Sequence, residues 1–308
     1  MVLSLPEPDQ NTGSFDMQFK DLTGTDKLSI RVRMFMGHVF MSALLYSGWA
    51  APLAADVSIT QLANEGVIFS DGETRILIDG MVVEPYSVYG GLPPDVAPLF
   101  EQVSGPFSGI DLVLASHRHH DHNQPRFACQ FLQKSPGTQF FSSPQVIGLM
   151  REKCRTFITT SPRINEINPQ YGEPHVIELQ EARVTVFPLS HGAGSYARIQ
   201  NYGHLVEMGG MTLLHIGDAA MDPLDFARAG LDSVEIDVAL VPFWYFQPGP
   251  GSQVMTRFFD APNKIAVHIP PGEMDEIKGY MSENFPQVII LKNTLDQAAF
   301  SAVIQPLP

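Results

Sequence analysis

Histidine and aspartate are concentrated in one short segment near the middle of the sequence. Residues 116–122 read Ser-His-Arg-His-His-Asp-His and contain the pattern His-x-His-x-Asp-His, whose members are His117, His119, Asp121 and His122. Imidazole and carboxylate groups together suit zinc, iron or manganese, and a short loop can turn them toward two adjacent ions. A surface cluster or an artificial tag would not follow the apolar run 112–115 directly. The segment therefore predicts a metal site at the end of a buried strand.

Other chemically capable residues follow apolar runs in the same way. The runs 184–189, 212–216 and 265–267 are followed by His191, Asp218 and His268, and the run 238–241 leads into Pro242 and the aromatic segment 243–246. Ligands in layered α/β proteins bind outside such strand ends, where loops converge on one point. We therefore expect these side chains to meet the first cluster.

The elements that must position these residues can be expected from local patterns. Short strands are predicted at 57–62, 66–69 and 74–78, with Asp71-Gly72 forming a hairpin turn between the last two. Helical periodicity is clearest over 126–132, 144–151 and 273–285, and these helices should cover the sheets from outside. Asp237, just before a predicted strand, is expected to support the fold.

The ordered set of motifs resembles the signature of the metallo-β-lactamase superfamily over about residues 56–275. The resemblance implies an α/β fold, the four-layer αβ/βα sandwich. It assigns the first metal to His117, His119 and His191, the second to Asp121, His122 and His268, and the bridging position to Asp218. Asp79, in Leu-Ile-Asp-Gly, and His215 would support these ligands. The opening 63–67, Ala-Asn-Glu-Gly-Val, is more similar to the lactonase-like and phosphodiesterase-like branches than to true β-lactamases.

The resemblance implies an enzyme with two divalent metal ions, zinc first, with manganese or iron able to compete. A metal-bridging hydroxide would attack a small ester, lactone or amide; Asp121 would be the catalytic residue that orients it, and a metal-bound water or Asp121 would return a proton to the leaving group. A metal-dependent phosphodiesterase or nuclease and a non-catalytic metal- or ligand-binding module are the alternatives. The balance of 19 basic and 33 acidic residues, a formal charge of -14, argues against long nucleic acids as partners.

Four aromatic side chains are expected to line a substrate pocket: Tyr86, Tyr89, Trp244 and Tyr245. They lie beside strand ends that carry metal ligands and would favour an apolar or mixed small-molecule substrate. The competing interpretation is that they fill the end of the sandwich as core residues.

Three regions are predicted along the chain. Residues 1–33 are polar and expected to be a disordered extension, 34–55 resemble a signal peptide or membrane anchor, and 56–308 form the catalytic domain. A cleaved signal would send the protein to the periplasm or medium, and a membrane partner is expected only if 34–55 is retained. The two cysteines, Cys129 and Cys154, are expected to be buried thiols, with a single disulfide as the alternative. No oligomeric state is predicted.

Overall fold

The computed structural model describes residues 16–20, 26–31 and 56–302. Two strands, β1 (Asp16–Lys20) and β2 (Asp26–Arg31), pair in antiparallel fashion, with Asp16 opposite Arg31. They lie within the stretch for which the sequence predicts disorder. The other residues of that stretch and the expected signal segment 34–55 lie outside the described residues, and the assignment of both regions stays a prediction.

The first sheet of the main domain has seven strands in the order β15-β3-β4-β5-β6-β7-β8. Their bounds are β3 (Val57–Gln61), β4 (Val67–Ser70), β5 (Arg75–Ile78), β6 (Leu112–Ala115), β7 (Gln139–Ser142), β8 (Ile164–Glu166) and β15 (Gln297–Phe300). Pairing is antiparallel from β15 to β5 and parallel from β5 to β8. The predicted hairpin at Asp71-Gly72 is confirmed: the Asp71 carboxylate accepts the Thr74 N–H at 2.8 Å, and Gly72 adopts a φ of 93°.

The second sheet has six strands in the order β14-β13-β12-β11-β10-β9. Their bounds are β9 (His175–Glu178), β10 (Ala182–Ser190), β11 (Gln200–Met208), β12 (Met211–His215), β13 (Val238–Pro242) and β14 (Asn263–Val267). Pairing is antiparallel from β9 to β12 and parallel from β12 to β14. The Asp237 carboxylate accepts the Thr212 N–H at 2.7 Å, which confirms its expected support of the strands.

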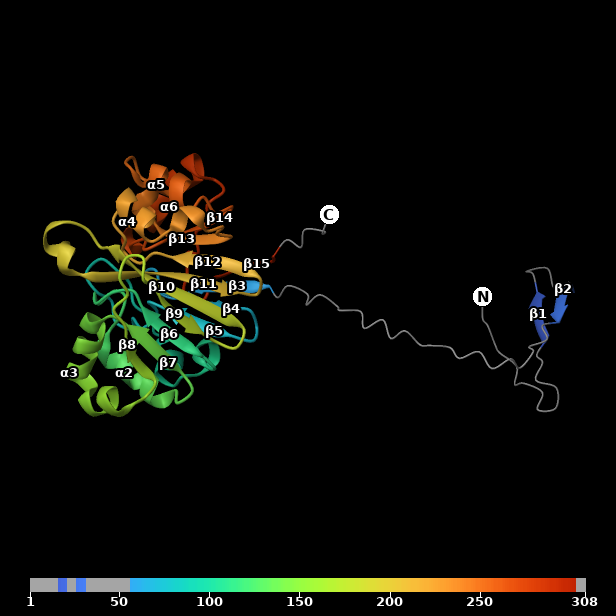
Figure 1. Cartoon of the computed structure of the whole chain (residues 1–308), viewed down its shortest axis with the longest axis horizontal. Helices are drawn as coiled ribbons and strands as arrows, with labels where there is room; N and C mark the ends of the chain where they lie inside the picture. Colours follow the sequence, from blue (N-terminus) through green and yellow to red (C-terminus); the bar gives the residue numbers. More distant parts are fainter. Residues whose placement is uncertain (1–15, 21–25, 32–55, 303–308) are drawn as a thin grey trace. The chain divides into compact units, whose positions relative to one another are not determined.

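The two sheets pack face to face, with helices on both outer faces (Figure 1). Helices α1 (Ala97–Glu101), α2 (Pro125–Lys134) and α3 (Pro144–Thr160) cover the first sheet, and α4 (Pro223–Arg228), α5 (Gly251–Phe258) and α6 (Met274–Asn284) cover the second. Short 3-10 helices are η1 (Gly105–Phe107), η2 (Gly194–Arg198), η3 (Leu231–Ser233), η4 (Phe243–Phe246) and η5 (Pro271–Glu273). The predicted four-layer sandwich is confirmed.

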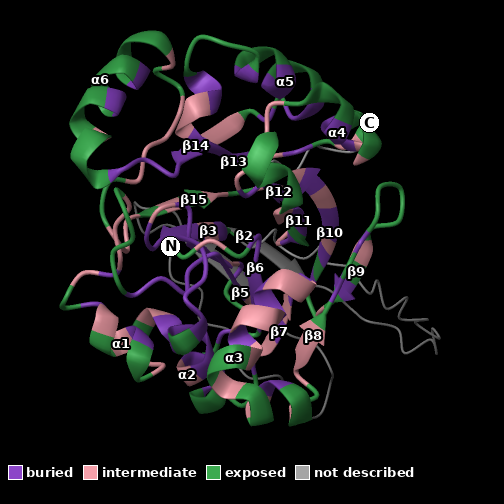
Figure 2. Cartoon of the chain, turned by 90° about the vertical axis from the view of Figure 1, so that its left-hand side faces the viewer, coloured by how far each residue is buried: buried purple, intermediate pink, exposed green. Residues whose placement is uncertain are grey.

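Apolar side chains of both sheets fill the space between them. Phe69 of the first sheet and Val184 and Leu213 of the second are fully buried in this inner core. Figure 2 shows the same division: burial is concentrated in the strands, while the outward faces of the helices are exposed. Fully burying each such side chain stabilises the fold by roughly 1.5–3 kcal/mol, so the inner core holds the strand ends in a rigid frame.

The three predicted helices are confirmed as α2, α3 and α6, although α3 continues beyond residue 151 to Thr160. The Ser143 hydroxyl accepts the Val146 N–H and caps the start of α3, where Pro144 takes the first turn. Among the described residues, no helix is long and apolar enough to span a membrane.

The expectation of two buried thiols is wrong. Cys129 of α2 and Cys154 of α3 form a disulfide, with their Cα atoms 6.2 Å apart. The backbone of Cys154 leaves helical geometry, with φ −143° and ψ 54°. The 25-residue separation along the chain did not indicate the pairing, because it arises only when α2 and α3 pack beside each other.

Candidate metal centre

The predicted metal ligands come from both sheets and meet beyond the carboxyl ends of their strands. The cluster His117–His122 follows β6 of the first sheet, while His191 follows β10, Asp218 follows β12 and His268 follows β14 of the second. The structure brings all seven predicted ligands together: His117, His119, Asp121, His122, His191, Asp218 and His268. Face-to-face packing of the sheets therefore joins loops that are up to 151 residues apart, from position 117 to position 268.

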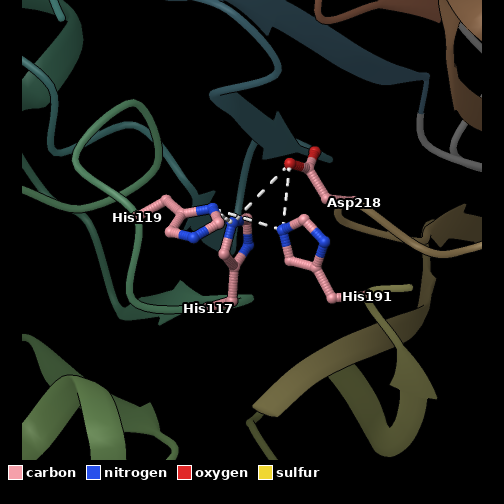
Figure 3. A group of neighbouring side chains, drawn as sticks. All are labelled: His117, His119, His191 and Asp218. Atoms are coloured by element: carbon pink, nitrogen blue, oxygen red, sulfur yellow. Dashed lines mark hydrogen bonds and ion pairs between the residues drawn. The ribbon is translucent and has the colours of Figure 1, made fainter. Parts of the chain in front are cut away.

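One set of donor atoms consists of three imidazoles and a carboxylate (Figure 3). His119 Nδ1 lies 2.9 Å from His117 Nε2 and 3.2 Å from His191 Nε2. Asp218 Oδ2 lies 3.7 Å from His117 Nε2 and 3.4 Å from His191 Nε2. Four donors of this kind converging on one point form a set that fits zinc.

A second set of donors lies on the other side of Asp218. Its Oδ1 atom is 3.4 Å from His122 Nε2 and 3.1 Å from His268 Nε2, and these two nitrogens are 3.0 Å apart. Asp121 Oδ2 is 3.6 Å from His268 Nε2 and 3.8 Å from His122 Nε2. The two oxygens of one carboxylate thus face two different donor sets.

The electrostatic surroundings of the two sets differ. Burial, together with the neighbouring His122, holds the pKa of His117 well below its usual value, and burial beside His191 lowers the pKa of His119. Burial opposes protonation of His122 and His268 as well, but Asp218 and other nearby carboxylates outweigh it and raise both pKa values. In the first set the neutral forms of His117 and His119 are therefore favoured, and the second set lies in a field that attracts positive charge.

Asp79 contacts the metal-binding loop, whereas His215 contacts the β3–β4 turn and Gly217, and its expected support of a ligand stays a prediction. The Asp79 carboxylate accepts the Ser116 N–H at 2.6 Å and the Ser116 hydroxyl, and it lies 3.0 Å from His122 Nδ1. Burial favours the neutral form of Asp79, but the charge and hydrogen bond of His122 outweigh it and hold the pKa well below its ordinary value. His215 Nε2 donates to the backbone carbonyl of Glu65 at 3.1 Å. Asp79 therefore fixes the start of the metal-binding loop.

Two supporting residues were not indicated by the sequence. Asn201 of β11 accepts the Asp218 N–H through its Oδ1 atom at 3.1 Å and donates to the carbonyls of Leu189 and Ile216. A Cβ at Gly217 would lie 2.4 Å from that Oδ1 atom, and Gly217 has a φ of 54°, so only glycine fits. The second is Glu65, whose buried carboxylate lies 3.2 Å from His122 Nδ1. Asn201 belongs to no motif, and Glu65 lies in the 63–67 opening, to which no role at the metal site was assigned, so both roles are recognisable only from contacts across the sheets.

A cavity of about 490 Å³ opens over the donor sets. Its described lining is Tyr86, Ser87, Tyr89, His119, Asp121, His191, Tyr196, Asp218, Ala219, Ala220, Met221 and Trp244. Three of the four aromatics predicted to line a pocket are among them. No lysine or arginine is among these described lining residues.

Aromatic rings pack directly on the candidate ligands. The Tyr89 ring meets the His268 ring edge-on at 4.3 Å, and the Trp244 ring lies 5.1 Å from it. Tyr196 of η2 stacks on His191 at 5.0 Å and was not expected at the site; its place five residues after His191 is the one sequence clue. Burial and the carboxylates of Asp218 and Asp121 raise the pKa of Tyr89 to about 12, so its hydroxyl stays protonated at neutral pH.

The placement of Tyr245 in the pocket is wrong. Its side chain is fully buried, and its hydroxyl donates to the carbonyl oxygens of Ala219 at 3.0 Å and Ala220 at 3.2 Å. Residues of a 3-10 helix point in different directions, so Trp244 faces the cavity while Tyr245 packs behind the loop that carries Asp218.

Residues 74–278 match a family model described as a beta-lactamase superfamily domain, which covers well over half of the chain. The chain therefore belongs to the metallo-β-lactamase superfamily of metal-dependent hydrolases. No curated protein matches the sequence significantly.

Solved structures share the fold at low sequence identity. A possible metal-dependent hydrolase from Veillonella parvula has a TM-score of 0.56 and 16% identity, covering 79% of this chain and 99% of its own. A metallo hydrolase from Ignicoccus hospitalis has a TM-score of 0.54 and 16% identity, covering 80% and 99%. The Zn(2+)-bound PqqB from Methylobacterium extorquens has a TM-score of 0.51 and 14% identity, covering 79% and 99%. At these identities the likeness supports the fold alone.

Proposed function

We propose that this chain is a hydrolase with a binuclear metal centre that acts on a small ester, lactone or amide. The observation that carries the proposal is the position of Asp218. Its Oδ2 atom faces His117 and His191, while its Oδ1 atom faces His122 and His268, at 3.1–3.7 Å. A carboxylate between two sets of imidazoles is suited to bridge two metal ions.

The donor sets support two divalent ions, with zinc as the first choice. A set of three imidazoles, of which His117 and His119 favour the neutral form, suits zinc, and the Zn(2+)-bound PqqB of the same fold supports this choice. The second set, with Asp121 and Asp218, is richer in oxygen, so manganese or iron can compete there. Asp218 Oδ1 and both Glu65 oxygens are buried without a hydrogen-bond partner among the described residues, as expected where positive charge is required nearby.

The reaction follows from what the ions supply and what the side chains hold. When bound, the ions would polarise the substrate oxygen and make water a nucleophile near neutral pH. Asp121 lines the cavity and would orient the attacking water through Oδ2, then carry its proton to the leaving group. The protonated hydroxyl of Tyr89, at the same cavity wall, would donate a hydrogen bond to a substrate oxygen.

The cavity wall supports a neutral substrate with an apolar or aromatic group. Tyr86, Tyr89, Tyr196 and Trp244 offer ring surfaces, and no cationic side chain is among the described lining residues. A phosphodiester would bring a negative charge next to Asp121 and Asp218 without a basic partner in that lining, so we favour the carboxyl-derived substrates over the phosphodiesterase alternative.

The test combines metal content with turnover. The purified full chain is measured by plasma mass spectrometry and assayed against ester, lactone, amide, β-lactam and phosphodiester chromogens. His119→Ala should abolish hydrolysis and lower metal content, while His175→Ala, on β9 away from the site, serves as the matched control. Two ions per chain with turnover are expected. Less than one ion after reconstitution, with no turnover, would instead support a non-catalytic binding module.

We also propose that the protein is exported to the periplasm or medium. The disulfide Cys129–Cys154 supports this, because such bonds persist mainly in oxidising compartments. Cell fractionation with N-terminal sequencing tests it: the expected product starts close to residue 56 and is found outside the cytoplasm. A cytoplasmic product that retains residues 34–55 would contradict export.

A further inference from the structure

The turn between β3 and β4 contacts the second donor set through its backbone and its side chains. The Asn64 amide donates to the carbonyl of Asp121 at 2.9 Å, and the Asn64 carbonyl accepts the His268 N–H at 3.1 Å. Gly66 packs so closely on the loop after β5 that a Cβ would lie 2.6 Å from the Asp79 carbonyl oxygen. The turn therefore has a fixed position, and residue 65 must point toward the metal-binding side chains.

Glu65 places a carboxylate where ordinary protein contacts do not satisfy it. The residue is 1% exposed, and neither side-chain oxygen accepts a hydrogen bond from any described residue. Two imidazoles lie nearby: Oε1 is 3.2 Å from His122 Nδ1 and 4.0 Å from His215 Nε2. A buried carboxylate without a cationic or hydrogen-bonding partner is costly, so its presence needs a compensating positive charge.

Asp79 makes the position of Glu65 more unusual, because it already occupies the same imidazole nitrogen. Asp79 Oδ2 lies 3.0 Å from His122 Nδ1, and the Asp79 carboxylate also accepts two hydrogen bonds from Ser116. Asp79 thus has structural partners of its own, whereas Glu65 has none beyond the histidines. The acidic side chains around His122 and His268 are therefore four in number: Glu65, Asp79, Asp121 and Asp218.

Resting on the proposed two-metal function, we propose that Glu65 is a positioning residue for the second ion. Its Oε1 atom places a negative charge 3.2 Å from His122 Nδ1, the nitrogen that Asp79 also faces, which favours the proton on Nδ1 and leaves the Nε2 lone pair facing the second donor set. Its charge adds to the attraction for a cation, since ligand atoms of Glu65, Asp218 and His268 lie within 4.8 Å of one another. The first donor set gains little, because Glu65 makes no ion pair with its three histidines in the described residues.

The test measures the affinity of each ion rather than activity. The full chain is stripped of metal and titrated with Zn²⁺ in competition with a chromophoric chelator, as wild type, Glu65→Gln and Glu65→Asp, with the exposed Glu73→Gln as matched control. Glu65→Gln should weaken binding of the second ion roughly 10- to 100-fold, with the first ion unaffected. Glu65→Asp, which keeps the charge, should fall between Glu65→Gln and wild type.

Thermal unfolding of the metal-free proteins separates positioning from a general structural role. Glu65→Gln should unfold no earlier than wild type, because it removes a buried charge that has no hydrogen bond. Unchanged affinity of Glu65→Gln for both ions would overturn the proposal. An equal loss of affinity for both ions, together with unfolding at a lower temperature than wild type, would overturn it as well. If Glu65→Gln does not fold, unchanged second-ion affinity in Glu65→Asp would overturn it. A wild type that binds no second ion would contradict the proposed function itself.

Discussion

The disulfide between α2 and α3 gives a stability prediction whose size can be worked from the chain. Cys129 and Cys154 close a loop with a sequence separation of 25, for which the chain-entropy relation gives about 3.5 kcal/mol at 25 °C. Replacing both residues by alanine should lower the free energy of unfolding by about this amount. For a domain of this size the melting temperature should fall by about 10 °C.

Urea unfolding followed by circular dichroism measures the effect, with metal concentration held constant. Reduced wild-type protein is the matched control, because it loses the cross-link but keeps every side-chain heavy atom. Agreement between the reduced protein and the double variant assigns the loss to the cross-link. A larger loss of unfolding free energy in the double variant than in the reduced protein measures the packing of the buried Cys129 side chain.

Two results would refute the reasoning. Titration of the denatured, unreduced protein with a thiol reagent should find no reactive thiols among Cys129 and Cys154; two thiols per chain would mean that the bond does not form. Equal unfolding free energies for oxidised and reduced protein would mean that the loop constraint contributes nothing.

Three further predictions concern single side chains. Burial lowers the pKa of His204 to about 3, so the native state binds fewer protons than the unfolded state between pH 3 and 6.5, and stability is lost as pH falls. The free energy of unfolding should therefore be about 2 kcal/mol lower at pH 5 than at pH 7.5. His204→Leu should remove that part of the pH dependence measured by urea unfolding. Tyr245→Phe should lower the free energy of unfolding by about 1 kcal/mol, since the Ala219 and Ala220 carbonyls lose its hydroxyl. Trp244→Ala should raise KM for aromatic esters about tenfold without changing metal content.

Each of these predictions has a result that contradicts it. An unchanged pH dependence in His204→Leu would mean that this imidazole accepts a proton in the native state. Full stability in Tyr245→Phe would show that water replaces the lost hydrogen bonds. For Trp244→Ala, an equal rise in KM for aliphatic and aromatic esters would argue against ring stacking with the substrate, and the exposed Tyr280→Ala serves as its control.

Local patterns indicated the strands that precede the expected ligands and three of the helices, but not β7, β8, β9, β11, β15, α1, α4 or α5. The hairpin at Asp71-Gly72 and the helix starting at Pro144 depend on residues adjacent in sequence, so turn chemistry and capping predict them. The strands before His117, His191 and Asp218 were recognisable because each apolar run ends abruptly at a polar residue. The resemblance to a known family then assigned each of these ligands to a metal position.

Contacts between elements distant in sequence were not predictable in this way. Trp244 and Tyr245 are adjacent and chemically similar, yet one lines the cavity and the other supports the Asp218 loop, because the direction of each side chain is set by η4 and its packing. The thiols of Cys129 and Cys154 meet only once α2 lies beside α3.

The residue types and their positions after strands therefore determined the α/β class, the histidine and aspartate donors, and the metal chemistry that suits them. The family resemblance supplied the division of these donors around Asp218, and tertiary structure alone decided which other groups surround them. Glu65 and Asn201 show the physical reason: a single carboxylate or amide does not indicate its partners, and each acquires a role from burial and from contacts with segments distant in sequence.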